Sequence, residues 1–231
     1  MKRLVPFVEG RGDLKALPAL LARLVLHLGV DSLFVDTNPF RVQNLGKLFQ
    51  GGGAEWQRLV TAAVRTRHET GAILLILDGD VRRVSDMRYI ERFGDDHFCA
   101  FRVAAHLADL AKGSGAGSIV SVAAAFAMRE MESWAVSTID GLAEAKPSDE
   151  LEIPVGIAVP ENPEAMNDAK GWLKKALGKY KPTLHQLELA QRIPIDLAIK
   201  RSRSFRRLAN AVSQLNNAVR EGTYVCSPQL P

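Results

Sequence analysis

The sequence predicts an α/β protein in which a mostly parallel sheet is flanked by helices and followed by a helical C-terminal extension. Short apolar runs with the character of strands alternate with segments whose apolar residues recur at helical spacing, an order typical of parallel sheets. The chain has 231 residues, of which 47% are hydrophobic. That apolar content is enough for one substantial core.

The first two strands and two helices are predicted as follows. Residues 3–10 form a short apolar run that ends in glycine, and residues 32–36 form another, so both are expected to be strands. Between them, the leucines of residues 13–29 recur at helical spacing. Residues 38–53 contain a proline and three successive glycines and are expected to form a loop before a helix over residues 54–71.

The same alternation continues in the next part of the chain. Residues 72–77, AILLIL, predict a buried strand, and residues 118–128 predict a fourth strand. Residues 95–113 are expected to contain a third helix, and residues 129–142 become helical again. We therefore expect four parallel strands joined by helices.

Composition divides the chain into three parts. Residues 1–143 are expected to form the α/β domain, residues 144–169 a proline-rich and acidic connection, and residues 170–231 a basic helical region packed on the first domain. From Lys170 to Arg207 there are eleven basic and two acidic residues, in a chain whose net charge is +4. This asymmetry suits a polyanionic partner beside a metal site, although solvated helix faces would give the same pattern.

Several classes of protein are disfavoured. No segment approaches the roughly 18 consecutive apolar residues of a membrane span, and the first residues make a poor signal peptide. Cys99 and Cys226 have no metal-ligand spacing and are expected to be free thiols. A cytoplasmic protein with no membrane association is the expectation.

Acidic residues follow three of the four predicted strands. They are Glu9 after the first strand, Asp78 and Asp80 after the third, and Glu130 and Glu132 after the fourth. Ligands of parallel α/β proteins bind beyond the carboxyl ends of the strands, so these acids are expected to share one edge. Asp36 ends the second strand, and the sequence assigns it no specific role.

The spacing of these acids sets a condition. Residues i and i+2 of an extended segment point the same way, so Asp78 and Asp80 can face one cation if the strand continues to its last residue. Glu130 and Glu132 can cooperate only if the chain is still extended there. Clustered carboxylates favour a hard cation such as Mg²⁺ or Mn²⁺. A carboxylate after a strand can also simply cap the next helix.

The acidic segments resemble a known domain. FVEGRGD, LDGD and REMESW are similar, in their order and rough spacing, to the acidic motifs of the Toprim domain. Toprim is the catalytic fold of topoisomerases, DnaG-type primases and the nucleases of the OLD (overcoming lysogenization defect) family. In the OLD-like branch a Glu-x-Glu pair follows the fourth strand.

The C-terminal part resembles a narrower group. The run LGKYKPTLHQLELAQRIPIDLAIKRSRSFRRLANAV is similar to the tail of a Toprim-like bacterial family of unknown function, and NPFRVQNLG is similar to its basic loop after the second strand. The resemblance covers roughly residues 4–215. The chain departs from the pattern in lacking a further acid after LDGDV, in having Pro182 before the threonine, and in having His185 where aspartate is common.

This resemblance implies a Toprim-like fold with a Mg²⁺ site. Phosphodiester chemistry follows only by analogy, because fold does not fix function. An ATPase partner in prokaryotic defence is a further expectation from the resemblance. The oligomeric state is left open.

The leading hypothesis is Mg²⁺-dependent hydrolysis of a nucleic-acid phosphodiester by a nuclease or nickase. Asp78 and Asp80 would hold the metal, and Glu9 would be a metal ligand and a general acid or base. Glu130 and Glu132 would complete the site or hold a second metal.

Basic residues are the candidates for contact with the nucleic acid. Lys181 is expected at the catalytic site as well as on the phosphates. The residues expected to neutralise phosphates are Arg41, Lys181, Arg201, Arg203 and Arg207.

Other functions compete with this one. A HAD-like phosphatase would use the Asp-x-Asp of ILLILDGDV, but that motif usually opens such a chain and continues with Gly-Thr. A nucleotide-sugar transferase with a metal-binding Asp-x-Asp is a weaker alternative. An alternative that is not an enzyme is a non-catalytic subunit, which would have a vestigial Toprim site and would bind nucleic acid or an ATPase.

Overall fold

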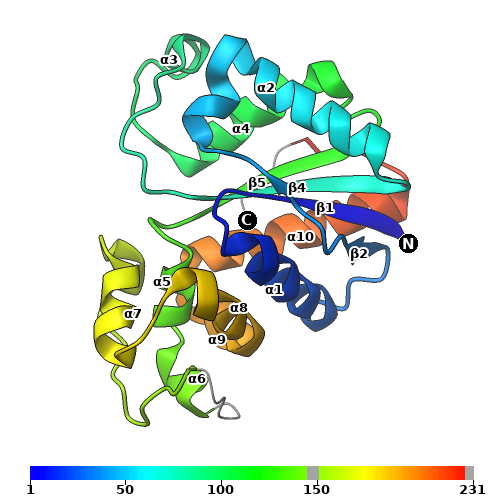
Figure 1. Ribbon diagram of the computed structural model, residues 1–231. Coiled ribbons are helices and arrows are strands. Elements are labelled where there is room, and N and C mark those ends of the chain that lie inside the picture. Colours follow the sequence, from blue (N-terminus) through cyan, green and yellow to red (C-terminus); the bar gives the residue numbers. More distant parts are fainter. Residues whose placement is uncertain (145–150, 227–231) are drawn as a thin grey trace.

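The fold is described from a computed structural model that covers residues 1–144 and 151–226 (Figure 1). A central sheet is covered by helices on both faces, which confirms the predicted α/β class. In the part of the chain that the structure describes, no helix combines the length and apolar character needed to cross a membrane.

The sheet is parallel throughout. Its strands are β1 (Lys2–Val8), β2 (Leu33–Val35), β3 (Phe40–Arg41), β4 (Thr70–Asp78) and β5 (Ser121–Ala127). The strand order is β2-β1-β4-β5, with the two-residue β3 also paired with β1. The four predicted strands are therefore confirmed, and β3 is an addition within the expected loop.

Helices cover the two faces unequally. One face carries α2 (Leu45–Thr66), α3 (Met87–Phe93) and α4 (Ala100–Ala111) (Figure 1). The other side of the sheet carries α1 (Asp13–His27), α5 (Glu132–Val136), α6 (Ile139–Glu144), α7 (Ala169–Leu177), α8 (Pro182–Arg192), α9 (Ile195–Arg201) and α10 (Arg203–Glu221). The C-terminal helices thus complete the layer that α1 begins.

Each face of the sheet has its own hydrophobic core. Leu4 and Val8 of β1 pack on the side of α1 and α10, whereas Val5 and Phe7 pack on the side of α2 and α4. This division follows from the alternation of side chains along a strand. Phe205 of α10 is fully buried in the first core, so the C-terminal region is part of the fold.

The segment expected to be a loop is partly helical. The Asn44 side chain accepts a hydrogen bond from the Lys47 backbone N–H, and α2 begins immediately after this cap. Leu48 is fully buried, so the first turn has an apolar face to pack. Gln50 to Gly53 then leave helical geometry, with Gly51–Gly53 at positive φ. The glycines bend the helix instead of preventing it.

Two further segments need comment, the one before the expected third helix and the predicted connection at residues 144–169. The helix α3 was not predicted, and it precedes the expected third helix, α4. In the predicted connection, residues 145–150 lie outside the described residues. The described remainder of that connection has one short 3-10 helix, Pro163–Ala165.

The topology creates a switch point at the carboxyl ends of β1 and β4. From β1 the chain passes through α1 to β2 on one side, and then through α2 to β4 on the other side of β1. In open parallel sheets the crevice at such a reversal is the usual place for a ligand. The loops after β1, β4 and β5 surround it.

Candidate functional site

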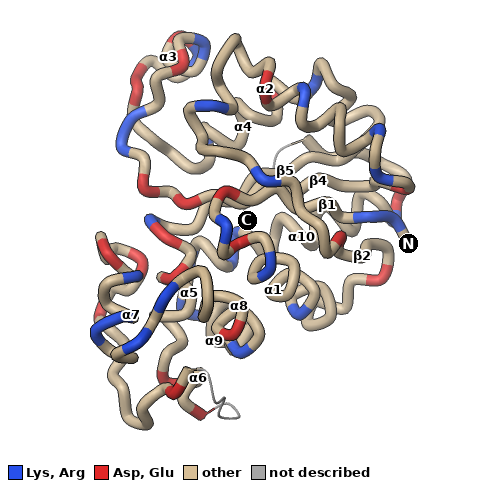
Figure 2. The backbone as a smooth tube through the Cα atoms, viewed as in Figure 1, with Lys and Arg blue, Asp and Glu red and all other residues tan. Residues whose placement is uncertain are grey.

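The acids after β1 and β4 lie together at the switch point. Glu9 follows β1 directly and is half-buried, Asp78 is the last residue of β4, and Asp80 is exposed beyond it. Asp78 and Asp80 both act electrostatically on Glu9, so the three carboxylates share one site. Figure 2 shows acidic positions along this edge of the sheet.

The second acidic pair reaches the same edge by a different backbone path from the expected one. The strand β5 ends at Ala127, Arg129 adopts a positive φ of 66°, and α5 begins at Glu132. The condition that the chain stay extended at Glu130 and Glu132 is therefore wrong. The turn at Arg129 still brings both carboxylates to a common partner.

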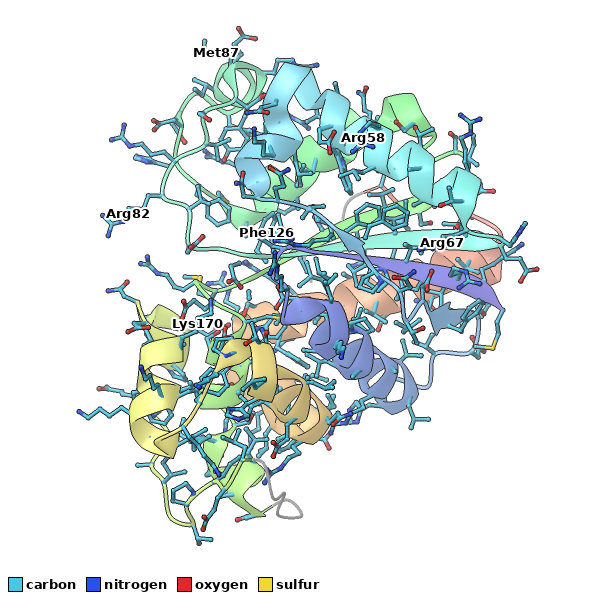
Figure 3. The ribbon with its side chains drawn as sticks, viewed as in Figure 1. Arg58, Arg67, Arg82, Met87, Phe126 and Lys170 are labelled. Atoms are coloured by element: carbon cyan, nitrogen blue, oxygen red, sulfur yellow. The ribbon has the colours of Figure 1, made fainter. Side chains whose placement is uncertain are left out.

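That partner is Lys170, at the first turn of α7. Its Nζ lies 3.3 Å from Glu130 Oε1, 3.5 Å from Asp78 Oδ2 and 3.7 Å from Glu132 Oε2. Its backbone N–H also donates to Glu130 Oε2 at 3.1 Å. Figure 3 labels Lys170 beside the end of the sheet. One ammonium group thus joins acids from two strand ends.

Tyr180 and a backbone amide fix the orientation of two of these acids. The Tyr180 hydroxyl donates to Glu132 Oε1 at 3.0 Å, and the Met131 N–H donates to Asp78 Oδ1 at 2.9 Å. The other Glu132 oxygen, Oε2, is buried and has no hydrogen-bond partner among the described residues. The ammonium Nζ of Lys170 lies 3.7 Å from this oxygen.

Burial raises the pKa values of three carboxyl groups in this cluster. Burial, reinforced by the charges of Asp78 and Asp80, raises the pKa of Glu9 to about 7. Burial also raises the pKa of Asp78 to about 6 and that of Glu132 to about 7, although Lys170 opposes both shifts. Groups with pKa values near neutrality are suited to general acid or base work.

Lys170 is held in its charged form. Burial alone would lower the pKa of its ammonium group, but the carboxylates of Glu132, Asp78 and Glu130 outweigh it and raise the pKa above the ordinary value. A lysine with a raised pKa supplies a fixed positive charge and is a poor base. Burial and the adjacent Glu132 likewise raise the pKa of Tyr180, which stays a hydrogen-bond donor.

A polar bridge positions the turn after Glu9. The Gly10 N–H donates to Asp13 Oδ2 at 2.7 Å, and Gln186 Nε2 donates to Asp13 Oδ1 at 2.8 Å. A Cβ on Gly12 would lie 2.0 Å from Gln186 Oε1. A side chain at residue 12 would displace the Gln186 amide, so Gly12 leaves room for the bridge that ties the acidic edge to α8.

Sequence reasoning did not select four of these residues: Asp13, Lys170, Tyr180 and Gln186. A signal for two of them was present, because Tyr180 and Gln186 lie in the C-terminal run that resembles the bacterial family. Lys170 offered no signal beyond its charge, since it is one of eleven basic residues between positions 170 and 207.

Of the basic residues selected from the sequence, some border the acidic edge and others do not. Arg41 lies next to Val8 in the β1–β3 pairing and donates to the Glu9 backbone carbonyl at 3.2 Å. Lys181 is exposed at the start of α8, and its backbone N–H donates to His185 Nδ1. Arg201 forms an ion pair with Asp140.

Arg203 and Arg207, on the first turns of α10, line a groove beside Gly79. Arg41, Arg203 and Arg207 are therefore the selected cations that border the acidic edge. The lysine that contacts the carboxylates themselves is Lys170, which the sequence did not single out.

Asp36 has a structural role. It is 4% exposed and forms ion pairs with Arg67 at 3.0 Å and Arg3 at 3.4 Å. Arg67, labelled in Figure 3, also lies over the Phe40 ring. These contacts hold the edge of the sheet at β2, and they account for an acid to which the sequence assigned no function.

The metal-binding capacity of the edge rests on its donor chemistry. Within residues 1–144 and 151–226, no three His, Cys, Asp or Glu side chains converge closely enough to form a ready metal-binding group. The site does offer the hard carboxylate oxygens of Glu9, Asp78 and Asp80. Mg²⁺ commonly takes only one or two protein carboxylates and fills its other positions with water and phosphate oxygens. The residues present fit that mode of binding.

Fold and site together define a parallel α/β protein with a lysine-bridged carboxylate cluster at its switch point. The chain belongs to the family described as Domain of unknown function (DUF4276), which matches residues 8–213. That match spans the acidic edge and most of α10. No curated protein and no solved structure matches the chain.

Proposed function

We propose that the protein hydrolyses a phosphodiester bond of a nucleic acid with the help of Mg²⁺ or Mn²⁺. The observation that supports this most is the meeting of acids from three strand ends at the switch point, with raised pKa values for Glu9, Asp78 and Glu132. Such shifts cluster at functional sites. The arrangement of acids is also the one that suggested kinship with Toprim nucleases.

In this proposal, Asp78 and Asp80 hold the metal, with Glu9 bordering it. The bound metal would neutralise charge on the phosphate and orient the attacking water. Glu9 would take a proton from that water as the water oxygen bonds to phosphorus. The ester P–O bond would break with its electron pair on the leaving oxygen, which would take up a proton from solvent. A pKa of about 7 leaves Glu9 partly deprotonated at neutral pH, as a general base requires.

Lys170 and Arg41 supply charge in this mechanism. Lys170 stays protonated and limits repulsion among Asp78, Glu130 and Glu132. Arg41 is exposed next to Glu9 and is available to a phosphate of the substrate. Glu130 and Glu132 hold Lys170 in place, and a role as second-metal ligands would require Lys170 to move.

The test combines metal binding with cleavage. The paired variant Asp78→Asn/Asp80→Asn is expected to lose Mg²⁺ binding in calorimetry and Mg²⁺-dependent nicking of supercoiled plasmid, while its far-ultraviolet circular dichroism spectrum is unchanged. Glu91→Gln removes an exposed acid of α3 and is the matched control. A folded wild type that binds no Mg²⁺ or Mn²⁺ would contradict the proposal.

A second candidate is a non-catalytic subunit that binds nucleic acid or an ATPase. Lys170 favours it, because an internal ammonium group already neutralises part of the charge that a metal would neutralise. Binding of nucleic acid without hydrolysis under all metal conditions would support this candidate. An ATPase partner in prokaryotic defence rests on the family resemblance alone, and affinity purification from the native host would test it.

A further inference from the structure

A groove adjoins the acidic edge on the side of β5. It lies between the loop after β4, the end of β5 and the start of α10, and its walls include Gly79, Phe98, Met128, Arg203 and Arg207. Gly79 stands between the two aspartates proposed to hold the metal. A chain lying in this groove would therefore pass directly to the acidic edge.

One wall of the groove carries two arginines with no ion-pair partner among the described residues. Arg203 and Arg207 are four residues apart on α10 and so share one face of the helix. Neighbouring arginines differ, because Arg201 pairs with a carboxylate and Arg206 donates to two backbone carbonyl groups. Two unpaired guanidinium groups on one wall suit consecutive phosphates.

The N-terminus of α10 is itself already satisfied. Glu164 accepts hydrogen bonds from the backbone N–H groups of Arg203 and Ser204 and from the Ser202 hydroxyl, at 2.8–2.9 Å. This carboxylate fills the position that an anion takes at a helix N-terminus. Anion binding in the groove must therefore use the arginine side chains.

The groove also has apolar residues in its lining, among them Phe98 and Met128. Phe98 is half-buried with its ring at 5.4 Å from the ring of Phe126, in an edge-to-face contact. Met128 is 48% exposed, although it directly follows the buried strand β5. Figure 3 labels Phe126 at this end of the sheet. A combination of basic side chains with apolar and aromatic ones is typical of sites for unstacked bases.

We propose that this groove binds an unpaired stretch of the nucleic-acid substrate, with its phosphates on Arg203 and Arg207 and a base against Phe98 and Met128. The inference rests on the proposed function for the adjoining reaction and adds that the substrate is single-stranded or locally opened. A duplex keeps its bases stacked inside and presents only its backbone to such apolar side chains.

The experiment measures binding without metal, so its result is independent of hydrolysis. Fluorescence anisotropy in EDTA would follow a labelled oligothymidylate of about 20 nucleotides, and separately its duplex with oligoadenylate. The variants are Arg203→Gln/Arg207→Gln and Phe98→Leu. Arg220→Gln, at the exposed far end of the same helix, is the control for loss of charge.

The expected result is specific to the single strand. The double arginine variant should bind it about tenfold more weakly, and its salt dependence should fall by about 1.4 in the slope of log K against log salt, about 0.7 for each lost phosphate contact. Phe98→Leu should weaken single-strand binding at an unchanged salt slope. The control should stay within about twofold of wild type.

Two results would overturn the inference. One is a double variant that binds the single strand as tightly as wild type does, or a wild type that does not bind the single strand at all. The other is duplex binding as tight as single-strand binding and equally sensitive to the two variants. If wild type binds the single strand through the groove but neither binds Mg²⁺ nor nicks DNA, the proposed hydrolysis is contradicted. The inference about the groove is then still supported.

Discussion

At the residue scale, the site is governed by one cation among several buried acids. Lys170 contacts Asp78, Glu130 and Glu132, and Glu132 is only 3% exposed. Removing one partner of a buried ionic cluster leaves uncompensated charge, which usually costs more than the cluster contributes as a whole. The stability of this edge should therefore depend strongly on the lysine.

We expect Lys170→Met to lower the free energy of unfolding by about 1–3 kcal/mol at pH 8, a range reduced because the Lys170 side chain is 38% exposed. The loss should be smaller at pH 5, where the raised pKa values leave Asp78 and Glu132 largely protonated. Urea denaturation at both pH values measures the difference. Lys174→Met, at an exposed position of the same helix, should change stability little. Equal losses in the two variants would show that the cluster is not stabilising.

The raised pKa of Glu9 also predicts a pH dependence of stability. An acid whose pKa is higher in the folded state binds more protons when folded, so its stabilising effect is complete below the unfolded pKa and is lost as the pH rises. For Glu9 that window runs from the ordinary value of 4.5 to about 7.

Between pH 5 and pH 8, the free energy of unfolding of wild type should fall more than that of Glu9→Gln, by on the order of 1–2 kcal/mol, a range reduced because solvent screens the half-buried Glu9. Urea denaturation without divalent metal at several pH values would measure both curves. Added Mg²⁺ should restore stability mainly above pH 7, where the carboxylates are ionised. Parallel curves for the two proteins would contradict the raised pKa.

At the scale of single elements, the break within α2 depends on glycine. Gly53 has a φ of 87°, and a Cβ there would lie 2.9 Å from Leu110 Cδ1 of α4. Gly29 also has a positive φ, of 64°, but a Cβ there would meet no atom within 4 Å. The two positions share a positive φ, which strains any substituted side chain, and they differ in steric contact.

Gly53→Ala should therefore destabilise the protein more than Gly29→Ala, by about 2–4 kcal/mol against about 1 kcal/mol. Thermal and urea denaturation of the two variants would measure the difference. Similar losses would mean that α2 and α4 shift apart without cost to their packing.

At the scale of the whole molecule, the C-terminal helices are part of the layer that covers the sheet. Phe205, Leu208 and Val212 of α10 are fully buried in the same core as Leu4 of β1. Arg23 of α1 also donates to the Ala190 carbonyl of α8 at 2.8 Å. Without residues 170–231, one face of the sheet would expose its apolar side chains to water.

A chain ending at residue 169 is expected not to fold, and to aggregate or give a spectrum without native near-ultraviolet signal. Co-expression with a separate chain of residues 170–231 should restore folded protein, because the missing layer is then supplied in trans. Circular dichroism and size-exclusion chromatography would measure both outcomes. A monomeric, cooperatively unfolding chain of residues 1–169 would contradict this expectation.

The parallel α/β class and the three acidic strand ends could be predicted from the sequence, because both depend on local patterns of residues. The strand AILLIL is one continuous apolar run, and Asp78 and Asp80 follow it directly. The common edge then follows from the rule that parallel strands end on one side. Local patterns were less informative at residues 38–53, where a cap at Asn44 and a buried Leu48 outweighed the glycines.

Tertiary structure alone decided which charges meet. Lys170 and Lys181 are both lysines in the basic region, yet only Lys170 lies among the carboxylates, because α7 begins where the turn at Arg129 delivers Glu130. In the same way, Arg201 is used in an ion pair whereas Arg203 faces a groove. Distances between segments far apart in the chain depend on how helices pack on the sheet, and that packing leaves no periodic pattern in the sequence.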